Sequence, residues 1–220
     1  MFEQFKKDLE QSNLVEQLRS EIIGDGISIP GPYGEKPLVY ADYVASARAL
    51  RRIERFVSED ILPYYANSHT RSSYCGAYMT QMREEARQEI ARSIGADDNY
   101  SVVFTGSGAT AAINRLVRLL GIEDAVRSGV QPVIFIGPYE HHSNILPWRE
   151  TGAEVVIIPE AINGGPDLTI LEQKLHEYAD RALKVGSFSA ASNVTGITTD
   201  VAAVARVLKA NGALSVWDYA

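Results

Sequence analysis

The second half of the chain alternates short apolar runs with amphipathic segments. From about residue 100 onward, apolar runs predict β-strands at 101–105, 132–136, 154–158, 183–188 and 214–218. The intervening segments have helical spacing, at 108–120, 143–151, 167–178 and 201–211. Strands that alternate with helices indicate βαβ units, and continuous apolar strands indicate burial on both faces. The pattern therefore predicts an α/β fold, with a mostly parallel sheet and helices on both faces.

The first hundred residues follow a different pattern. Apolar residues near helical spacing predict an amphipathic helix over 2–23, and glycine and proline then interrupt regular structure as far as Gly34. Further patterns predict a strand and two helices, at 38–40, 44–60 and 72–94. We therefore expect a helical arm and hinge over residues 1–35, followed by the front part of a larger domain over residues 36–220.

Composition and charge narrow the classes of partner. The 220 residues suit one large domain, with 45% hydrophobic and 22% charged residues as in ordinary globular proteins. A net charge of −7 argues against nucleic acid or an anionic membrane as the main partner. No apolar run approaches the roughly 18 residues of a membrane span. The single cysteine, Cys75, excludes an internal disulfide and a cysteine-based zinc site, and fits a reducing cytosol. We therefore expect a cytoplasmic protein.

Candidate site residues follow the predicted strands. Ligands of open α/β sheets bind where the strands end, at the carboxyl edge of the sheet. Residues just after the strands form four clusters, at 105–110, 139–142, 189–193 and 218. Because parallel strands end at the same edge, we expect these clusters to converge there.

The first cluster, Thr105 to Thr110, is rich in small residues and joins a strand to a helix. Small residues let a ligand approach the backbone, and a helix start offers free N–H groups to a phosphate. The turn is neither a Walker A loop nor a G-x-G-x-x-G motif, because Ala111 stands at the third glycine position. The alternative is a tight turn in which Ser107 or Thr110 caps the helix.

The other clusters contain His141, Asn193 and Asp218. A histidine after a buried strand suits a base, a metal ligand, a flat surface for an aromatic ligand, or a hydrogen-bonded loop residue. The metal role is weak, because none of the four histidines is spaced i, i+4 from another. Asn193 can donate to a phenolate-like oxygen or stabilise the turn around Gly196. A carboxylate at Asp218 needs a partner, such as a protonated pyridine nitrogen or the N–H groups of a following helix.

The order of these clusters resembles the class V aminotransferase group of fold-type I pyridoxal phosphate enzymes, and most of all cysteine desulfurases and selenocysteine lyases. The segment Glu140–Trp148, EHHSNILPW, is the most specific part and is similar to the family's EHHANxxPW. Three further stretches are similar to YLDxAASA, SNVxG and VDxAQ, at Val39–Ala47, Ser192–Gly196 and Val216–Ala220. The resemblance runs from about residue 38 to Ala220.

The resemblance implies pyridoxal 5'-phosphate as cofactor, a small amino acid as substrate, no metal, and a homodimer. Residues 36–220 would be the front part of the cofactor-binding large domain. His141 would stack on the cofactor ring, Asn193 would contact its phenolic oxygen or the substrate, and Asp218 would pair with the pyridine nitrogen. The phosphate would be held by Gly108, Ala109 and Thr110. His141 and Asp218 are the expected catalytic residues.

Two departures from the family pattern are Ala109, where a hydroxyl residue is common, and Trp217, where a smaller aliphatic residue is usual. The family's cofactor-bearing lysine, in an SxHK stretch after the aspartate, is expected beyond Ala220. The alternatives are an aminotransferase that transfers an amino group, or a non-catalytic binding or assembly domain of this fold. A nicotinamide-binding domain is disfavoured, because the third glycine and a suitably placed acid are missing.

Overall fold

The sheet expected in the second half of the chain is present in the computed structural model, which describes residues 2–10 and 12–220. Its strands are β3 (Val133–Ile136), β4 (Glu154–Ile157), β5 (Lys184–Ser189) and β6 (Leu214–Asp218). They lie in the order β4-β3-β5-β6, and each neighbouring pair is parallel. This sheet belongs to a unit of residues 104–220, and residues 1–103 form a second unit.

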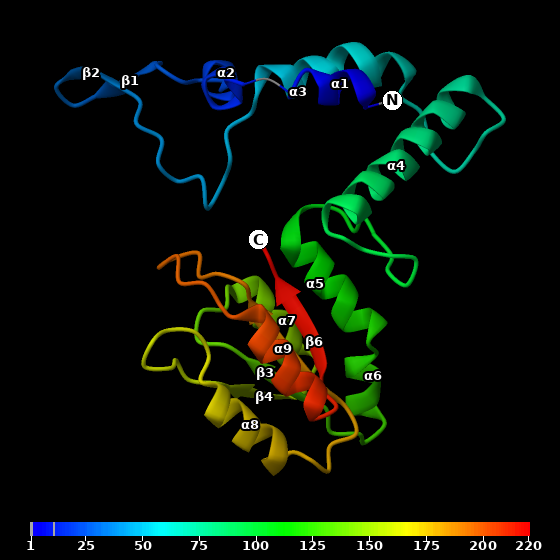
Figure 1. The fold of residues 1–220 in the computed structure, drawn as a ribbon, viewed down its shortest axis with the longest axis vertical. Helices are drawn as coiled ribbons and strands as arrows, with labels where there is room; N and C mark the ends of the chain where they lie inside the picture. The colour runs from blue at the N-terminus through cyan, green and yellow to red at the C-terminus, as the bar shows by residue number, and fades with distance from the viewer. Residues whose placement is uncertain (1, 11) are drawn as a thin grey trace. The chain divides into compact units, whose positions relative to one another are not determined.

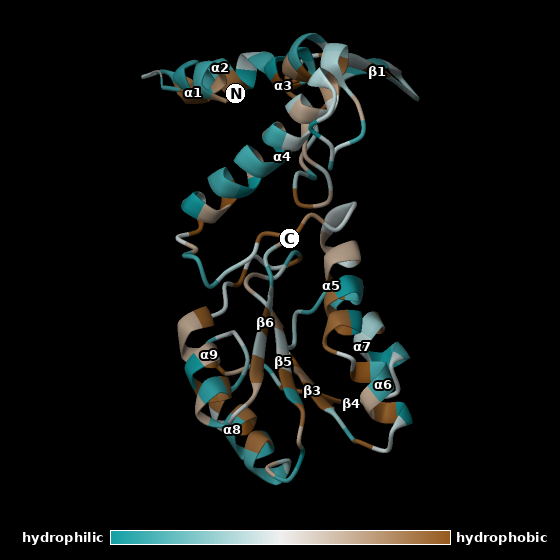
Figure 2. Ribbon diagram, turned by 90° about the vertical axis from the view of Figure 1, so that its right-hand side faces the viewer, coloured by the Kyte–Doolittle hydropathy of each residue, from teal (hydrophilic) through white to brown (hydrophobic). Residues whose placement is uncertain are grey.

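Helices cover both faces of the sheet (Figures 1 and 2). One face carries α8 (Leu168–Glu177) and α9 (Val201–Ala210). The opposite face carries α5 (Gly108–Leu119), α6 (Ile122–Arg127) and α7 (Leu146–Glu150). The predicted α/β fold is therefore confirmed. Helices lie on both faces because the apolar strands of a parallel sheet must be buried on both sides.

Alternation along β3 divides the core into two layers. Val133 and Phe135 pack with residues of α8 and α9, including Leu171 and Leu208. Ile134 and Ile136 pack on the other side with residues of α5, α6 and α7, such as Ile113, Ile122 and Trp148. All four β3 side chains are buried. Both faces of the strand therefore need apolar residues, and its sequence is a continuous apolar run instead of an alternating one.

The structure differs from the expectation in two segments after residue 100. Residues 101–105 form no strand, and Val103 and Phe104 are 61% and 43% exposed. A strand needs a hydrogen-bonded neighbour, and neither described edge strand, β4 or β6, pairs with this segment. The short helix α6 was not predicted, because only one turn separates it from α5.

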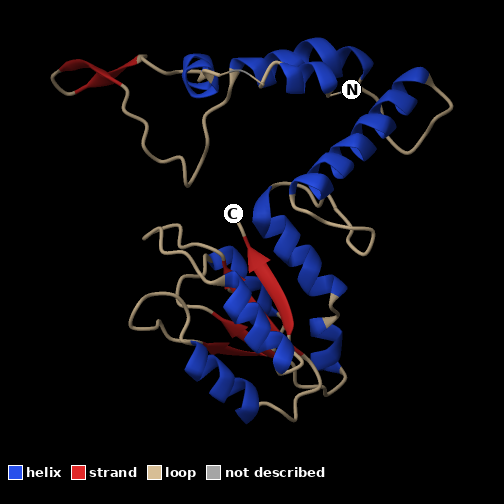
Figure 3. Ribbon diagram, in the orientation of Figure 1, coloured by secondary structure: helices blue, strands red, loops and turns tan. Residues whose placement is uncertain are grey.

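The unit of residues 1–103 is mainly helical and includes a two-stranded hairpin (Figure 3). Its helices are α1 (Glu3–Lys7), α2 (Leu14–Glu21), α3 (Arg51–Phe56) and α4 (Tyr74–Ser93), with a π-helical turn η1 (Val57–Ile61) and a 3₁₀ turn η2 (Leu62–Tyr64) after α3. The antiparallel hairpin is formed by β1 (Ser28–Gly31) and β2 (Gly34–Pro37). In the described residues, no helix is long and apolar enough to cross a membrane.

Several predictions for this unit were wrong in detail. The helix expected over 2–23 is two short helices, α1 and α2, and Gln11 between them lies outside the described residues. The strand expected at 38–40 is absent, and strands occur instead in the glycine- and proline-rich segment before it. Gly34, with φ of 99°, supplies the backbone conformation that the hairpin turn needs. The helix over 72–94 is confirmed as α4.

Candidate active site

Asp218 lies at the carboxyl edge of the sheet, as the sequence predicted. It is the last residue of β6 and lies opposite Ser189, the last residue of β5. The residue is buried, at 8% exposure, and its Oδ1 accepts a 2.9 Å hydrogen bond from the N–H of Ala220. One backbone donor is little compensation for a buried carboxylate, which can accept several bonds. Asp218 is therefore available to a cationic or N–H-bearing ligand.

Glu140 follows β3 and accepts hydrogen bonds from three residues, two in its own segment and one at the end of β5. Its Oε1 accepts from the backbone N–H of Ser189 at 2.8 Å and of Gly137 at 3.3 Å. Its Oε2 accepts from the Ser189 hydroxyl at 2.7 Å and from Nδ2 of Asn144 at 2.6 Å. Four donors satisfy one carboxylate, so Glu140 ties the segment after β3 to the end of β5.

Asn144 extends this network into the core. Its Oδ1 accepts from the Ser187 hydroxyl at 2.6 Å and from Nε1 of Trp148 at 3.2 Å. Asn144, Ser187 and Trp148 are all fully buried. No individual role was predicted from the sequence for Glu140, Asn144 or Trp148. The four-residue spacing of Asn144 and Trp148 was an available signal for that pair, because both lie in helical turns. Glu140 precedes those turns, so the spacing gives no signal for its role.

His141 lies beside Glu140, at the start of the 3₁₀ turn η3 (His142–Asn144). Its Nδ1 accepts a 3.2 Å hydrogen bond from the N–H of Ser143 and also contacts the Ser143 hydroxyl. An Nδ1 that accepts leaves the proton of the neutral ring on Nε2. The residue is exposed, so the ring surface is open to a ligand while the backbone holds one nitrogen.

Asn193 lies in the loop between β5 and α9, and the residue is exposed. The alternative role, stabilising the turn around Gly196, falls to Ser192 instead. The Ser192 hydroxyl accepts from the N–H groups of Val194 and Thr195, at 3.2 and 3.1 Å, and its carbonyl accepts from Gly196 at 3.0 Å. Ser192 thus stabilises the turn, and the exposed side chain of Asn193 lies at the surface.

The start of α5 has the features of an anion site. In Figures 1 and 2, α5 begins at the end of the sheet where β6 ends. Gly106 and Gly108 have φ values of 101° and 71°, which favour glycine, and Ser107 occupies the N-cap position without a side-chain capping bond. The side chain of Ser107 therefore does not cap the helix, which was the alternative expected from the sequence. The first N–H groups of the helix, including those of Ala109 and Thr110, remain for a ligand.

Tyr139, directly before Glu140, holds the loop that follows β4. Tyr139 donates its hydroxyl hydrogen to Glu160 and accepts from the N–H of Gly165 at 3.0 Å. The hydrogen bond to Glu160 raises the pKa of Tyr139 above its ordinary value. Tyr139 therefore remains a neutral donor at physiological pH, and it links the loops that follow β3 and β4.

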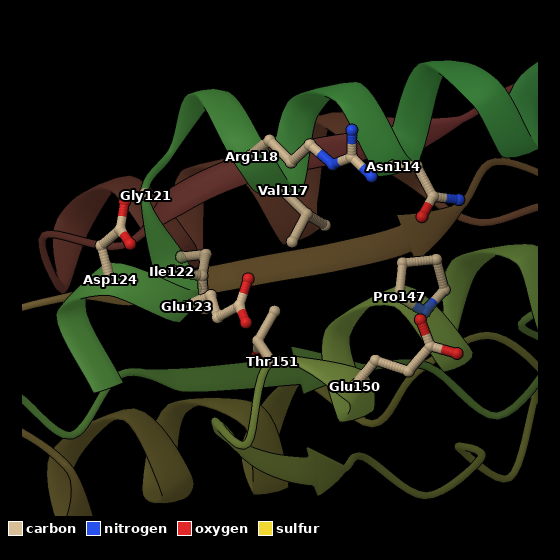
Figure 4. A pocket seen from close by; sticks show the side chains of 10 residues that line it. All are labelled: Asn114, Val117, Arg118, Gly121, Ile122, Glu123, Asp124, Pro147, Glu150 and Thr151. Atoms are coloured by element: carbon tan, nitrogen blue, oxygen red, sulfur yellow. The ribbon is translucent and has the colours of Figure 1, made fainter. Parts of the chain in front are cut away.

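A cavity lies away from these residues (Figure 4). It has a volume of about 310 Å³ between α5, α6 and α7. Its polar walls are formed by Asn114, Arg118, Glu123, Asp124, Glu150 and Thr151, with Val117, Ile122 and Pro147 beneath them. None of the predicted site residues lines it. The lining contains one basic and three acidic side chains, so its charge does not indicate a particular class of ligand.

The lysines of this unit lie away from the carboxyl edge. Lys184 begins β5, at the opposite end of the strand from Ser189, and donates to the carbonyls of Ala179 and Arg181. Lys174 is on α8, where it pairs with Glu177, and Lys209 is near the end of α9. Within the described residues there is also no group of three or more metal-binding side chains.

The carboxyl edge therefore combines complementary groups. A buried acid at Asp218 suits a protonated ring nitrogen, and the uncapped start of α5 suits a phosphate. His141 and Asn193 add an exposed ring and an exposed amide. Asp218 ends its strand, and His141 and Asn193 follow theirs, which agrees with the predicted topology. A planar ligand with a phosphate and a basic nitrogen matches this set of groups.

Comparisons with known proteins give a consistent result. The family model for aminotransferase class-V matches residues 39–220. A probable cysteine desulfurase of Vibrio cholerae is 31% identical over 186 residues, which are 83% of this chain and 44% of that protein. A cysteine desulfurase of Pectobacterium carotovorum subsp. carotovorum is 32% identical over 189 residues, with the same coverage of 83% and 44%.

Solved structures agree with the sequence comparison. The apo structure of a cysteine desulfurase from Thermococcus onnurineus NA1 superposes with a TM-score of 0.72 at 25% identity. The match covers 93% of this chain and 47% of that one. The chain thus spans less than half the length of the relatives it matches.

Proposed function

Because the chain belongs to the aminotransferase class-V family, we propose that it is the N-terminal portion of a pyridoxal phosphate-dependent cysteine desulfurase. The observation that carries this proposal is the buried carboxylate of Asp218 at the same edge as the uncapped start of α5. The relatives' names supply cysteine as the substrate class. In this proposal residues 1–35 form an arm, and residues 36–220 form the front of the cofactor-binding domain.

The residues of the carboxyl edge fit the cofactor's functional groups. The N–H groups at the start of α5, from Gly108 to Thr110, would bind the phosphate. Asp218 would hold the proton on the pyridine nitrogen, because an adjacent carboxylate favours the charged form of that ring. Pyridoxal phosphate, when bound, supplies an electron sink for carbanion chemistry on an amino acid.

His141 and Asn193 would orient the ring. The hydrogen bond from Ser143 to Nδ1 of His141 holds the imidazole, so that its exposed surface can lie against an aromatic ring. The exposed amide of Asn193 would donate to the phenolic oxygen. His141 and Asp218 are thus the proposed catalytic residues of this portion.

Binding of the cofactor to the 220-residue chain tests the proposal directly. The lysines of the α/β unit lie away from the carboxyl edge, so binding should be weak, reversible and not fixed by borohydride. Titration with pyridoxal phosphate should show saturable binding that weakens in Asp218→Asn. Absence of saturable binding, or a borohydride-fixed adduct that maps to a lysine at this site, would contradict the proposal.

The reaction itself is tested in the whole protein. Formation of alanine from L-cysteine would establish desulfurase activity. An added thiol supplies the two electrons that convert the sulfur or selenium removed in these assays to sulfide or selenide. Amino-group transfer to a keto acid would establish an aminotransferase instead, and selective release of selenide would establish a selenocysteine lyase. Failure of every reaction in a protein that contains the cofactor lysine would favour a non-catalytic domain.

We also propose that the whole protein is a cytoplasmic homodimer. Several large apolar side chains of the unit of residues 1–103 are exposed, including Tyr33, Val39 and Val44 at 91%, 84% and 69%. Exposed apolar residues favour association with another surface. Light scattering of the whole protein at micromolar concentration should give the mass of two chains, and a monodisperse monomer would contradict the dimer.

A further inference from the structure

We propose that Glu140 is a positioning residue, which holds the loop that carries His141 against the end of β5 and so in register with Asp218. This inference rests on the proposed function for its ligand, but the network itself can be tested without a cofactor. The four hydrogen bonds that Glu140 accepts make one carboxylate a clamp between two segments.

Glu140 holds the His141 loop at both of its ends. The first contact is with the N–H of Gly137, directly after β3, and the last is with the side chain of Asn144, at the end of η3. His141 lies between these two points. A loop fixed at both ends by the same carboxylate has little freedom, so the position of the imidazole depends on Glu140.

The same carboxylate relates this loop to the proposed pyridine-binding acid. Glu140 accepts from both the N–H and the hydroxyl of Ser189, and Ser189 is the register partner of Asp218. The N–H of Ala190 then donates to the carbonyl of Asp218 at 2.9 Å. His141 and Asp218 are thus held on a common frame, although they lie far apart in the sequence.

The packing around Glu140 shows that the arrangement is closely built. A Cβ added to Gly137 would lie 2.8 Å from Oε1 of Glu140 and 3.1 Å from Cδ1 of Phe188. Glycine at residue 137 therefore leaves the space that the carboxylate occupies. The fully buried side chains of Asn144 and Ser187 cannot turn to water if the carboxylate is lost.

Swapping the carboxylate of Glu140 and the amide of Asn144 tests whether Glu140 joins the two segments. Glu140→Gln puts an NH₂ group against the NH₂ of Asn144, whose oxygen is already used by Ser187 and Trp148. Asn144→Asp puts two carboxylates together at the same contact. In the double variant, the new amide at position 140 donates to the new carboxylate at position 144, while the amide oxygen still accepts from Gly137 and Ser189. Donors and acceptors then match again at position 144, at Gly137 and at the N–H of Ser189, with no change in net charge. The Ser189 hydroxyl, which donates to Oε2 in the unchanged chain, turns to accept from the amide.

The first measurement needs no cofactor. Hydrogen exchange of the full 220-residue chain is followed at the N–H of Ser189 and of Val185, a buried residue in the same strand. Each single variant should raise the exchange rate of Ser189 relative to Val185 by about tenfold, because a charge-assisted bond is lost. General destabilisation would move both amides together. The double variant should return the ratio close to that of the unchanged chain.

The second measurement is the affinity for pyridoxal phosphate, at a temperature where every variant is folded. Each single variant should bind about tenfold more weakly, and the double variant should recover. Glu150→Gln is the matched control, because Glu150 is an exposed residue of the neighbouring helix α7. It should change neither readout.

The outcomes separate this inference from the proposed function. An unchanged exchange ratio in the single variants, or a double variant no better than the singles, overturns the clamp. The positioning role is also overturned if the exchange ratio of Ser189 to Val185 changes while the affinity for the cofactor does not. Glu140 would then contribute only to the stability of the fold. If the unchanged chain binds no pyridoxal phosphate, the proposed function fails, and the exchange ratio with its rescue still decides whether Glu140 positions the loop.

Discussion

Ser189 and Asp218 end neighbouring parallel strands as register partners, and both are buried. Ser189 gives its N–H and hydroxyl to Glu140, so its polar groups are satisfied inside the protein. The Asp218 carboxylate receives one backbone hydrogen bond, from Ala220. Of two adjacent polar residues at the same edge, one is committed to the structure and the other is available for a ligand.

Replacing Asp218 with asparagine should weaken pyridoxal phosphate binding by about tenfold or more, because a charge-assisted contact becomes a neutral one. The fold should persist, since the asparagine oxygen can still accept from Ala220. Absorbance titration gives the affinity, and circular dichroism gives the fold. Asp180→Asn, at a largely exposed side chain, is the control. Equal affinities in the two variants would remove Asp218 from the site.

Gly108→Ala should weaken phosphate binding at the start of α5. Gly108 has φ of 71°, where a Cβ costs about 1–2 kcal/mol, so the first turn should shift. Affinity for pyridoxal phosphate should fall several-fold, whereas affinity for pyridoxal, which lacks the phosphate, should not change. Gly121→Ala is a matched control, because Gly121 has φ of 64° at the start of α6 and equally open surroundings. Identical losses in both variants would argue against a phosphate site at α5.

Gly186→Ala should destabilise the α/β unit by about 1–3 kcal/mol through overpacking. The added Cβ would lie 2.5 Å from Cδ2 of Leu208 and 2.9 Å from Cε2 of Phe188. Combined with Leu208→Ala, the new methyl group gains space, so the double variant should be more stable than the sum of the single effects predicts. Urea unfolding of the unchanged chain, the two single variants and the double variant measures this coupling, and simple additivity would contradict the contact.

The unit of residues 1–103 should lose stability in acid. The Arg52 guanidinium, 2.5 and 2.8 Å from the two Glu21 oxygens, holds the pKa of Glu21 below its ordinary value of 4.5. A lowered pKa in the folded state stabilises this unit above pH 4.5, and this contribution disappears as the pH falls through the folded pKa. The effect should be about 1 kcal/mol at most, because the pair is partly exposed.

Hydrogen exchange of α2 amides between neutral and acidic pH, compared with the same amides in Glu21→Gln, measures this contribution. The substitution should remove the acid-dependent part of the protection. An unchanged pH dependence in the variant would show that the ion pair contributes no stability to α2.

Local pattern was sufficient wherever a segment's own residues supply the driving force. The strands β3 and β5 are buried along nearly their whole length, and the helices α8 and α9 begin at side-chain caps, Asp167 and Asp200. Residues 101–105 have the same apolar character but form no strand, because β-structure also requires a neighbouring chain segment. The arm helix expected over 2–23 divides into α1 and α2, since short helices depend on the surfaces they pack against.

The sequence by itself determined the α/β fold, the parallel sheet and the placement of His141, Asn193 and Asp218 after strands, because apolar runs and strand order are local and topological properties. The tertiary structure alone decided the hydrogen bonds of Glu140. Its donors at Gly137, Asn144 and Ser189 come from segments as much as 49 residues away, so no spacing along the chain reveals that one carboxylate joins them. Hydrogen bonding between distant segments is set by how the strands and loops pack together.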